Sequence, residues 1–164
     1  MQPSKRLALI CFAFATPLKA SAASVVWEVA DGGNGHTYEA VVVPKGITWT
    51  DAKAAAEARG GHLVTLVSLA ENEWVFANVV DDESLWTQSG TAWRGPWIGL
   101  WQDRQDPNYS EPGNGWKWVT GEPVVYLAWS SNNQPNDADG NQDVAHYWNR
   151  AGEPRLVWQD AWEG

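Results

Sequence analysis

Cysteine is almost absent from this chain, because Cys11 is the only one among 164 residues. A single cysteine cannot close an internal disulfide, and this one lies in an apolar N-terminal run that we predict to be removed. The mature protein would then have no thiolate for catalysis and no sulfur ligand for a metal. Its stability must therefore come from side-chain burial and from any ions that it binds.

The sequence also has no apolar run of the roughly 20 residues that a transmembrane helix needs. The longest run, residues 7–18, follows two basic residues and precedes a short stretch of small ones. This order is typical of a secretory signal peptide. We predict a signal peptide over residues 1–22 and a single domain over residues 23–164, secreted or exported to the periplasm or the extracellular space.

Basic residues are scarce: 11 Lys and Arg stand against 20 Asp and Glu, a formal net charge of −9. A protein that binds nucleic acid needs a basic surface to neutralise phosphates, so we exclude nucleic acid as a partner. Outside the cell, a surplus of carboxylates is compatible with calcium binding.

Motifs of common enzyme classes are missing as well, including the serine-nucleophile pattern G-x-S-x-G and glycine-rich phosphate loops. Glu111 and Glu122 each precede a proline in a predicted loop, and nothing fixes the separation that a glycosidase pair needs. His36, His62 and His146 lie in different predicted elements without ligand spacing. We therefore expect no enzyme and no histidine metal site.

Tryptophan, in contrast, is abundant, with 13 residues that all follow the predicted signal peptide. An indole buries a large apolar area and needs only one hydrogen-bond partner. We expect most of these side chains in the core and one or two on the surface, where they would be able to stack on sugar rings.

The sequence pattern after the predicted signal peptide indicates an α+β domain. A strand is predicted over residues 37–43, and Thr48 with Asp51 caps an alanine-rich helix that ends at Arg59. A strand follows over residues 62–68, and then a second helix opens at Ser68 with a capping box to Glu71. Short aromatic strands within residues 96–101, 115–120, 146–149 and 155–160 complete the pattern, separated by polar loops.

Several short sequence segments, in the order in which they follow one another along the chain, resemble the C-type lectin-like domain. They are GHTYEAVVV (35–43), TWTDAKAAAEARGGHLVTLVSLAENEWV (48–75), WIGLW (97–101), WKWVTGEPVVYLAW (116–129), QPN (134–136) and WQD (158–160). The resemblance is to an exported, bacterial-style member without disulfides. It implies two helices flanking a small antiparallel sheet, with a long polar loop above it.

The polar loop is the segment in which the resemblance places ligand binding. Residues 132–143 hold six side-chain amides and three carboxylates, the oxygen ligands that Ca²⁺ prefers. The resemblance implies a cis peptide before Pro135 and a site that binds both calcium and a sugar. The sugar-binding candidates are Gln134, Asn136, Gln142, Gln159 and Asp160, and the metal candidates are Gln134, Asn136, Asp137, Asp143 and Asp160. Asp137, Asp139 and Asp143 would serve a second ion or hold the loop.

The chain departs from the family pattern in ways that weaken this site. Gln134 and Asn136 form a hybrid of the family's Glu-Pro-Asn and Gln-Pro-Asp tripeptides, which leaves the sugar open and removes one carboxylate. Gln142 stands in place of an acidic ligand, for which Asp143 is a possible substitute, and Gln159 stands in place of an asparagine. A strict count leaves Asp160 as the one carboxylate. Calcium affinity follows ligand charge, so we expect binding that is weak, roughly 10⁻⁴ to 10⁻³ M, or absent. Val144 replaces a usual cysteine. The family's last strand, which pairs with its first, is also expected to be missing, because few residues follow Asp160.

Two functions remain open from the sequence. The first is a secreted carbohydrate-binding module that binds a glycan or monosaccharide with weak calcium dependence. The alternative is a calcium-independent protein-binding or adhesive domain on the same scaffold.

Overall fold

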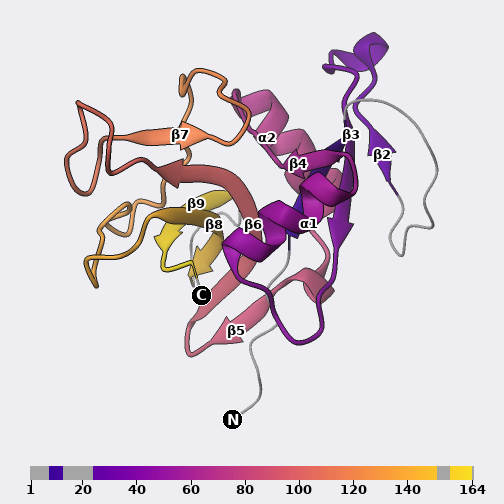
Figure 1. The fold of residues 1–164 in the computed structure, drawn as a ribbon. Helices are drawn as coiled ribbons and strands as arrows, with labels where there is room; N and C mark the ends of the chain where they lie inside the picture. Colours follow the sequence, from indigo (N-terminus) through magenta and orange to yellow (C-terminus); the bar gives the residue numbers. More distant parts are fainter. Residues whose placement is uncertain (1–7, 13–23, 151–155, 164) are drawn as a thin grey trace.

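The central element of the fold is the long strand β6, on which the other parts of the sheet are assembled (Figure 1). The structure is a computed structural model that describes residues 8–12, 24–150 and 156–163. The sheet of the described residues has the order β2-β3-β1-β6-β8-β9, and β4, β5 and β7 pair off this path. The strands are β1 Ala8–Phe12, β2 Val25–Val26, β3 Thr37–Val41, β4 Gly61–Leu63, β5 Thr87–Ser89, β6 Ala92–Gln102, β7 Trp116–Trp118, β8 Val144–Arg150 and β9 Val157–Ala161.

Two helices pack against this sheet, as predicted. Helix α1 Trp49–Ala58 begins where the Thr48 side chain accepts a hydrogen bond from the Asp51 amide at 3.0 Å. Helix α2 Leu69–Val75 begins where Ser68 accepts from the Glu71 amide at 3.1 Å, and a π-helical turn, Phe76–Val80, continues it. Short 3₁₀ turns occupy Val29–Asp31 and Glu83–Leu85. The predicted α+β fold with two helices is confirmed.

Close packing at the middle of β6 requires glycine at position 99. A Cβ there would lie 2.7 Å from the Leu63 carbonyl oxygen and 2.7 Å from the Val119 side chain. The Gly99 amide donates to the Val64 carbonyl at 2.8 Å, so the segment after β4 runs directly beside β6.

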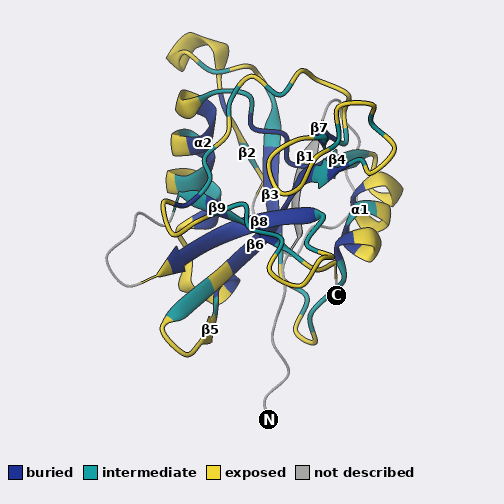
Figure 2. Ribbon diagram, turned by 90° about the vertical axis from the view of Figure 1, so that its left-hand side faces the viewer, coloured by how far each residue is buried: buried dark blue, intermediate teal, exposed yellow. Residues whose placement is uncertain are grey.

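The core lies on both faces of the sheet (Figure 2), with β6 and β8 buried along most of their lengths. The larger cluster contains Trp118 and Trp158, whose rings meet edge to face at 5.7 Å. The smaller cluster packs Trp49 and Ala52 of α1 against Trp97 of β6. Eight of the 13 tryptophans are buried, which confirms that most of them serve the core.

Several strands differ from the sequence prediction. The predicted strand over residues 62–68 pairs only through His62 and Leu63, and β2 and β5 were not predicted. Strand β1 lies within the predicted signal peptide and pairs antiparallel with both β3 and β4, with one parallel contact to β6. The other residues of the predicted signal peptide lie outside the described residues, and cleavage after Ala22 stays a prediction.

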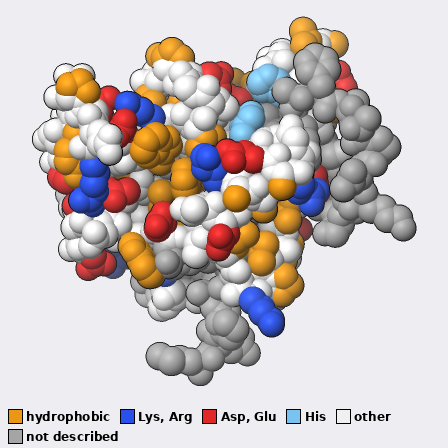
Figure 3. Space-filling model, viewed as in Figure 1, with side chains coloured by type: hydrophobic (Ala, Val, Ile, Leu, Met, Phe, Trp, Pro, Cys, Tyr) orange, Lys and Arg blue, Asp and Glu red, His pale blue; other side chains and the backbone are white. Residues whose placement is uncertain are grey.

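The surface fits the acidic composition. On the face seen in Figure 3, lysine and arginine side chains are scattered among acidic and apolar ones rather than gathered in a stripe. No helix among the described residues has the length and apolar character that crossing a bilayer requires.

Candidate functional site

The long polar segment between β7 and β8 is fastened to β9 at its middle. The Ser130 amide donates to the Trp158 carbonyl at 2.9 Å, and the Trp158 amide donates to the Ala128 carbonyl at 2.7 Å. These bonds hold the stretch that follows, residues 131–143, above the end of the sheet. The sequence-predicted tripeptide is in this stretch, and its Gln134–Pro135 peptide is cis, as the resemblance implied.

Asp160 of β9 joins the two separated segments of the predicted site. Its side chain is fully buried, and its Oδ2 accepts hydrogen bonds from the backbone amides of Asn136, at 2.9 Å, and Asp137, at 2.7 Å. Burial raises the pKa of the Asp160 carboxyl, and the two amide bonds counteract part of this effect. The structure thus brings Asp160 and the tripeptide together.

One side-chain oxygen of Asp160 and one of the tripeptide have no hydrogen-bond partner in the described part of the chain. They are Asp160 Oδ1 and Gln134 Oε1, and both are buried. Buried polar atoms are normally paired, because leaving one unpaired costs about 1–3 kcal/mol. A bound cation or a hydroxyl group would satisfy an unpaired acceptor of this kind.

The other predicted oxygen ligands are engaged within the loop. Asp137 Oδ1 accepts from the Gln142 amide at 2.9 Å. Asn136 Oδ1 and Gln142 Oε1 both accept from the Ala138 amide, at 3.0 and 3.1 Å. These bonds give the loop a closed shape, and each amide oxygen keeps a second lone pair for a further partner.

Asp143 forms an ion pair with Arg104, which the sequence analysis did not predict. The Arg104 Nε donates to both carboxylate oxygens at 3.0 Å, and its Nη2 donates to the Gly140 carbonyl at 2.8 Å. The ion pair raises the pKa of Arg104. Arg104 therefore ties the end of the loop to the segment after β6. Since 39 residues separate the two side chains, no local sequence signal could have indicated the pair.

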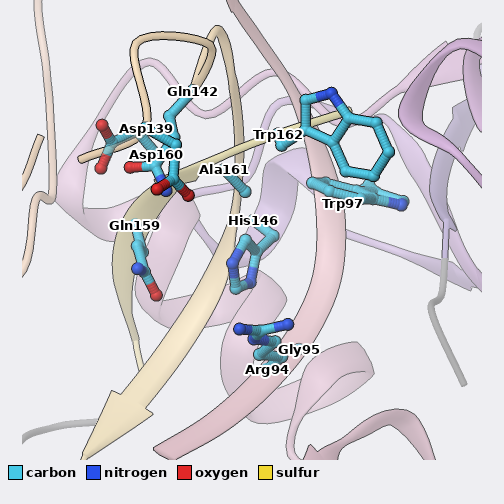
Figure 4. A pocket seen from close by; sticks show the side chains of 10 residues that line it. All are labelled: Arg94, Gly95, Trp97, Asp139, Gln142, His146, Gln159, Asp160, Ala161 and Trp162. Atoms are coloured by element: carbon cyan, nitrogen blue, oxygen red, sulfur yellow. The ribbon is translucent and has the colours of Figure 1, made fainter. Parts of the chain in front are cut away.

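Gln159 points to a different face of the sheet from Asp160, because side chains alternate along a strand. It lies opposite His146 on β8, and His146 lies opposite Trp97 on β6. On this face a cavity of about 200 Å³ opens beside the loop (Figure 4). Its lining includes Arg94, Trp97, His146, Gln159, Asp160 and Trp162. Sequence reasoning pointed to Gln159 and Asp160 but missed the others.

The donor set has the right chemistry for calcium and little charge. Gln134, Asn136 and Asp160 offer the hard oxygen atoms that Ca²⁺ prefers, and two of these oxygens lack a partner. Within the described residues, however, no group of three or more His, Cys, Asp and Glu side chains could hold a metal ion. The residues fit a weakly held Ca²⁺ and do not fit a tightly bound transition metal.

Comparison with known proteins agrees with the sequence resemblance. The sequence matches the family described as Lectin C-type domain over residues 45–160. A perlucin-like protein of Mytilus galloprovincialis is 29% identical over 105 residues, which are 64% of this chain and 58% of that protein. The pancreatic beta cell growth factor of Mesocricetus auratus is 30% identical over 100 residues, 59% of this chain and 50% of that protein. The chain thus spans about half the length of these curated relatives.

A solved structure agrees at the level of fold. The C-type lectin CEL-I from Cucumaria echinata has a TM-score of 0.52 and 21% sequence identity, and the match covers 71% of this chain and 76% of that one. At this identity the likeness concerns the arrangement of helices and strands.

Proposed function

The chain belongs to the C-type lectin domain family, and from this premise we propose that it is a carbohydrate-binding module that recognises sugars through the long loop with weak calcium dependence. One observation carries the proposal: among the described residues, Asp160 Oδ1, beside a cavity that Asp160 lines, and Gln134 Oε1 of the tripeptide are both buried without a hydrogen-bond partner. The signal peptide predicted over residues 1–22 supports a secreted or otherwise exported protein.

Calcium would be held by Gln134, Asn136 and Asp160. When bound, the ion would offer its remaining coordination positions to sugar hydroxyls. One carboxylate supplies little charge, so a dissociation constant of roughly 10⁻⁴ to 10⁻³ M is expected. Asp137 and Asp143 would contribute through the shape of the loop, since both carry hydrogen bonds within it.

The sugar itself would contact the amides of Gln142 and Gln159, which line the cavity. An amide group both donates and accepts hydrogen bonds, as a sugar hydroxyl does. Trp162 is 56% exposed at the edge of the same cavity, and its ring offers an apolar face for the C–H groups of a sugar ring.

Isothermal titration with methyl glycosides of mannose, galactose and N-acetylglucosamine tests the proposal. We expect binding to at least one glycoside in about 5 mM Ca²⁺, weakened severalfold or more by chelator. Asn136→Ala should reduce it, whereas Asn141→Ala, an exposed loop amide with one long bond to Asp139, is the control. No binding to any glycoside with or without calcium would refute the proposal.

A calcium-independent protein-binding domain remains the second candidate, and two observations favour it. The loop is closed by Asp160 and Arg104 through bonds that need no ion. The loop before it also exposes two large apolar side chains, Val125 at 76% and Leu127 at 40%. A partner captured equally well in chelator, and lost in Val125→Ser, would favour this function over sugar binding.

A further inference from the structure

The cavity beside the loop is chemically different at its two ends. Figure 4 shows Asp139, Gln142 and Asp160 gathered at one end and the Arg94 guanidinium at the other, with His146 and Gln159 between them. Trp97 and Trp162 lie along one side. A ligand that fills it would therefore meet hydrogen-bond acceptors at one end and a positive charge at the other.

Arg94 carries a charge that no carboxylate of the described residues neutralises. Arg59, in contrast, is paired with Glu39, and Arg104 is paired with Asp143. Arg94 has neither an ion pair nor a side-chain hydrogen bond in this part of the chain. It belongs to β6 directly before an irregularity in the pairing with β8. Its planar guanidinium is suited to hold a carboxylate through two parallel hydrogen bonds.

The floor between the two ends is rigid. His146 is 4% exposed, and its ring meets Trp97 edge to face at 5.5 Å. Its Nδ1 lies 2.6 Å from the Tyr147 carbonyl, and because a carbonyl only accepts, this nitrogen must carry the proton. The Trp97 Nε1 donates to the Ile47 carbonyl at 3.0 Å. Neither ring is free to swing out and change the spacing of the two ends.

The size of the cavity limits the ligand to one ring. About 200 Å³ is below the roughly 300–1,000 Å³ of pockets that enclose drug-sized molecules. A single hexose suits this space. Hydroxyls on one side of such a ring would reach Gln142 and Gln159, and a substituent on the other side would reach Arg94.

We propose that this cavity binds a monosaccharide with an anionic group, of which a uronic acid is the simplest case, and that Arg94 selects the anionic group. The inference rests on the proposed function, since it assigns the class of sugar to the same site. The formal net charge of −9 repels anions in general. The selection must therefore come from local contacts with Arg94.

The test compares matched sugars on the full chain by calorimetric or NMR titration in calcium. The probes are the methyl glycosides of glucuronic and galacturonic acid, their methyl esters, the neutral glucosides and galactosides, and the 6-sulfated sugars. We expect at least one uronide to bind tenfold or more tightly than its neutral parent and its ester. A 6-sulfated sugar that binds as tightly as the uronide would extend the ligand class to sulfated sugars. A 6-sulfated sugar that binds more weakly would show that Arg94 selects the planar carboxylate.

Variants then assign the selectivity to one side chain. Arg94→Gln should abolish the tenfold preference of uronides over their neutral parents, and Arg94→Lys should restore part of that preference. Lys53→Gln removes the same charge from α1, outside this cavity, and should leave the preference unchanged. Melting curves verify that each variant is folded.

Different failures have different meanings. Equal binding of uronides and neutral sugars, or a preference that survives Arg94→Gln, would overturn the inference and leave the proposed function standing. Equal losses in Lys53→Gln and Arg94→Gln would also overturn it, because the effect would then be one of overall charge. If no sugar of any kind binds, the proposed function falls and this inference falls with it.

Discussion

Asp160 offers the most informative single substitution, because the structure gives it a role that does not depend on calcium. Its Oδ2 accepts two backbone amides from the loop, those of Asn136 and Asp137. Replacing it by alanine would remove this junction together with any calcium ligand. Asparagine, in contrast, keeps an oxygen atom in nearly the same position and removes only the charge.

The magnitude follows from the two lost bonds. Hydrogen bonds to charged groups contribute about 1.5–3 kcal/mol each, but Asn136 and Asp137 are half-buried, so water replaces part of the loss. We expect Asp160→Ala to lower the free energy of unfolding by about 2–4 kcal/mol. For a chain of this size about 1 kcal/mol corresponds to a Tm change of about 2–4 °C, so its Tm should fall by about 5–15 °C.

Asp160→Asn should cost much less in the absence of calcium. Its bonds to the two amides become neutral and roughly half as strong, but the substitution also removes a charge whose burial raises its pKa. These effects oppose each other, and we expect a loss of at most about 1.5 kcal/mol. Both variants should lose the response to calcium.

The assay is thermal melting in chelator and in about 10 mM Ca²⁺. With a dissociation constant near 10⁻³ M, mass action adds about 1.4 kcal/mol to the folded wild-type protein, a Tm rise of about 3–6 °C. An Asp160→Ala variant that melts within about 2 °C of wild type in chelator would contradict this role of Asp160. An Asp160→Asn variant that keeps the wild-type calcium shift would show that the carboxylate has no part in the ion site.

Three further changes test other parts of the structure. Gln134→Glu adds a second carboxylate to the proposed ligand set and should tighten calcium binding about tenfold, measured by calorimetry; unchanged affinity would mean that this side chain does not face the ion. Gly99→Ala pushes a Cβ against the Leu63 carbonyl oxygen and the Val119 side chain and should cost about 1–3 kcal/mol in urea denaturation, and a neutral result would show that the sheet gives way there. A chain without residues 1–22 lacks β1, leaving β3 and β4 without this neighbour, and should associate as its concentration rises in light scattering; a stable monomer would contradict this.

The sequence predicted those elements whose signals are local. Thr48 and Ser68 mark the starts of both helices because a capping side chain bonds an amide only three residues away. Glu71 was predicted as a capping-box residue, yet its buried carboxylate accepts from the Tyr38 hydroxyl, at 2.7 Å, and from the Val67 amide, at 2.9 Å. The sequence spacing identified its position in the helix, and tertiary contacts determined its partners.

Strand β1 could not be predicted for a related reason. An apolar run after basic residues has the same pattern in a signal peptide and in a buried strand, and only its partners distinguish the two. Those partners, β3 and β4, lie more than twenty residues further along the chain. The same sequence therefore supports both readings, and the mass of the exported protein would decide between them.

The composition of the polar loop does not decide whether its side-chain oxygens bind an ion or bind the loop itself. Its oxygens suggested a calcium site, but the same oxygens close the loop, since Asp137 bonds the Gln142 amide and Asp143 bonds Arg104. A polar segment that binds an ion and one that binds itself have the same residues. The two kinds of segment differ in how many acceptor atoms remain without a partner once the hydrogen bonds within the loop are formed. In this protein those atoms include Gln134 Oε1 and Asp160 Oδ1, so the strength of calcium binding depends on whether one charge and a few neutral oxygens compensate the ion for its lost water.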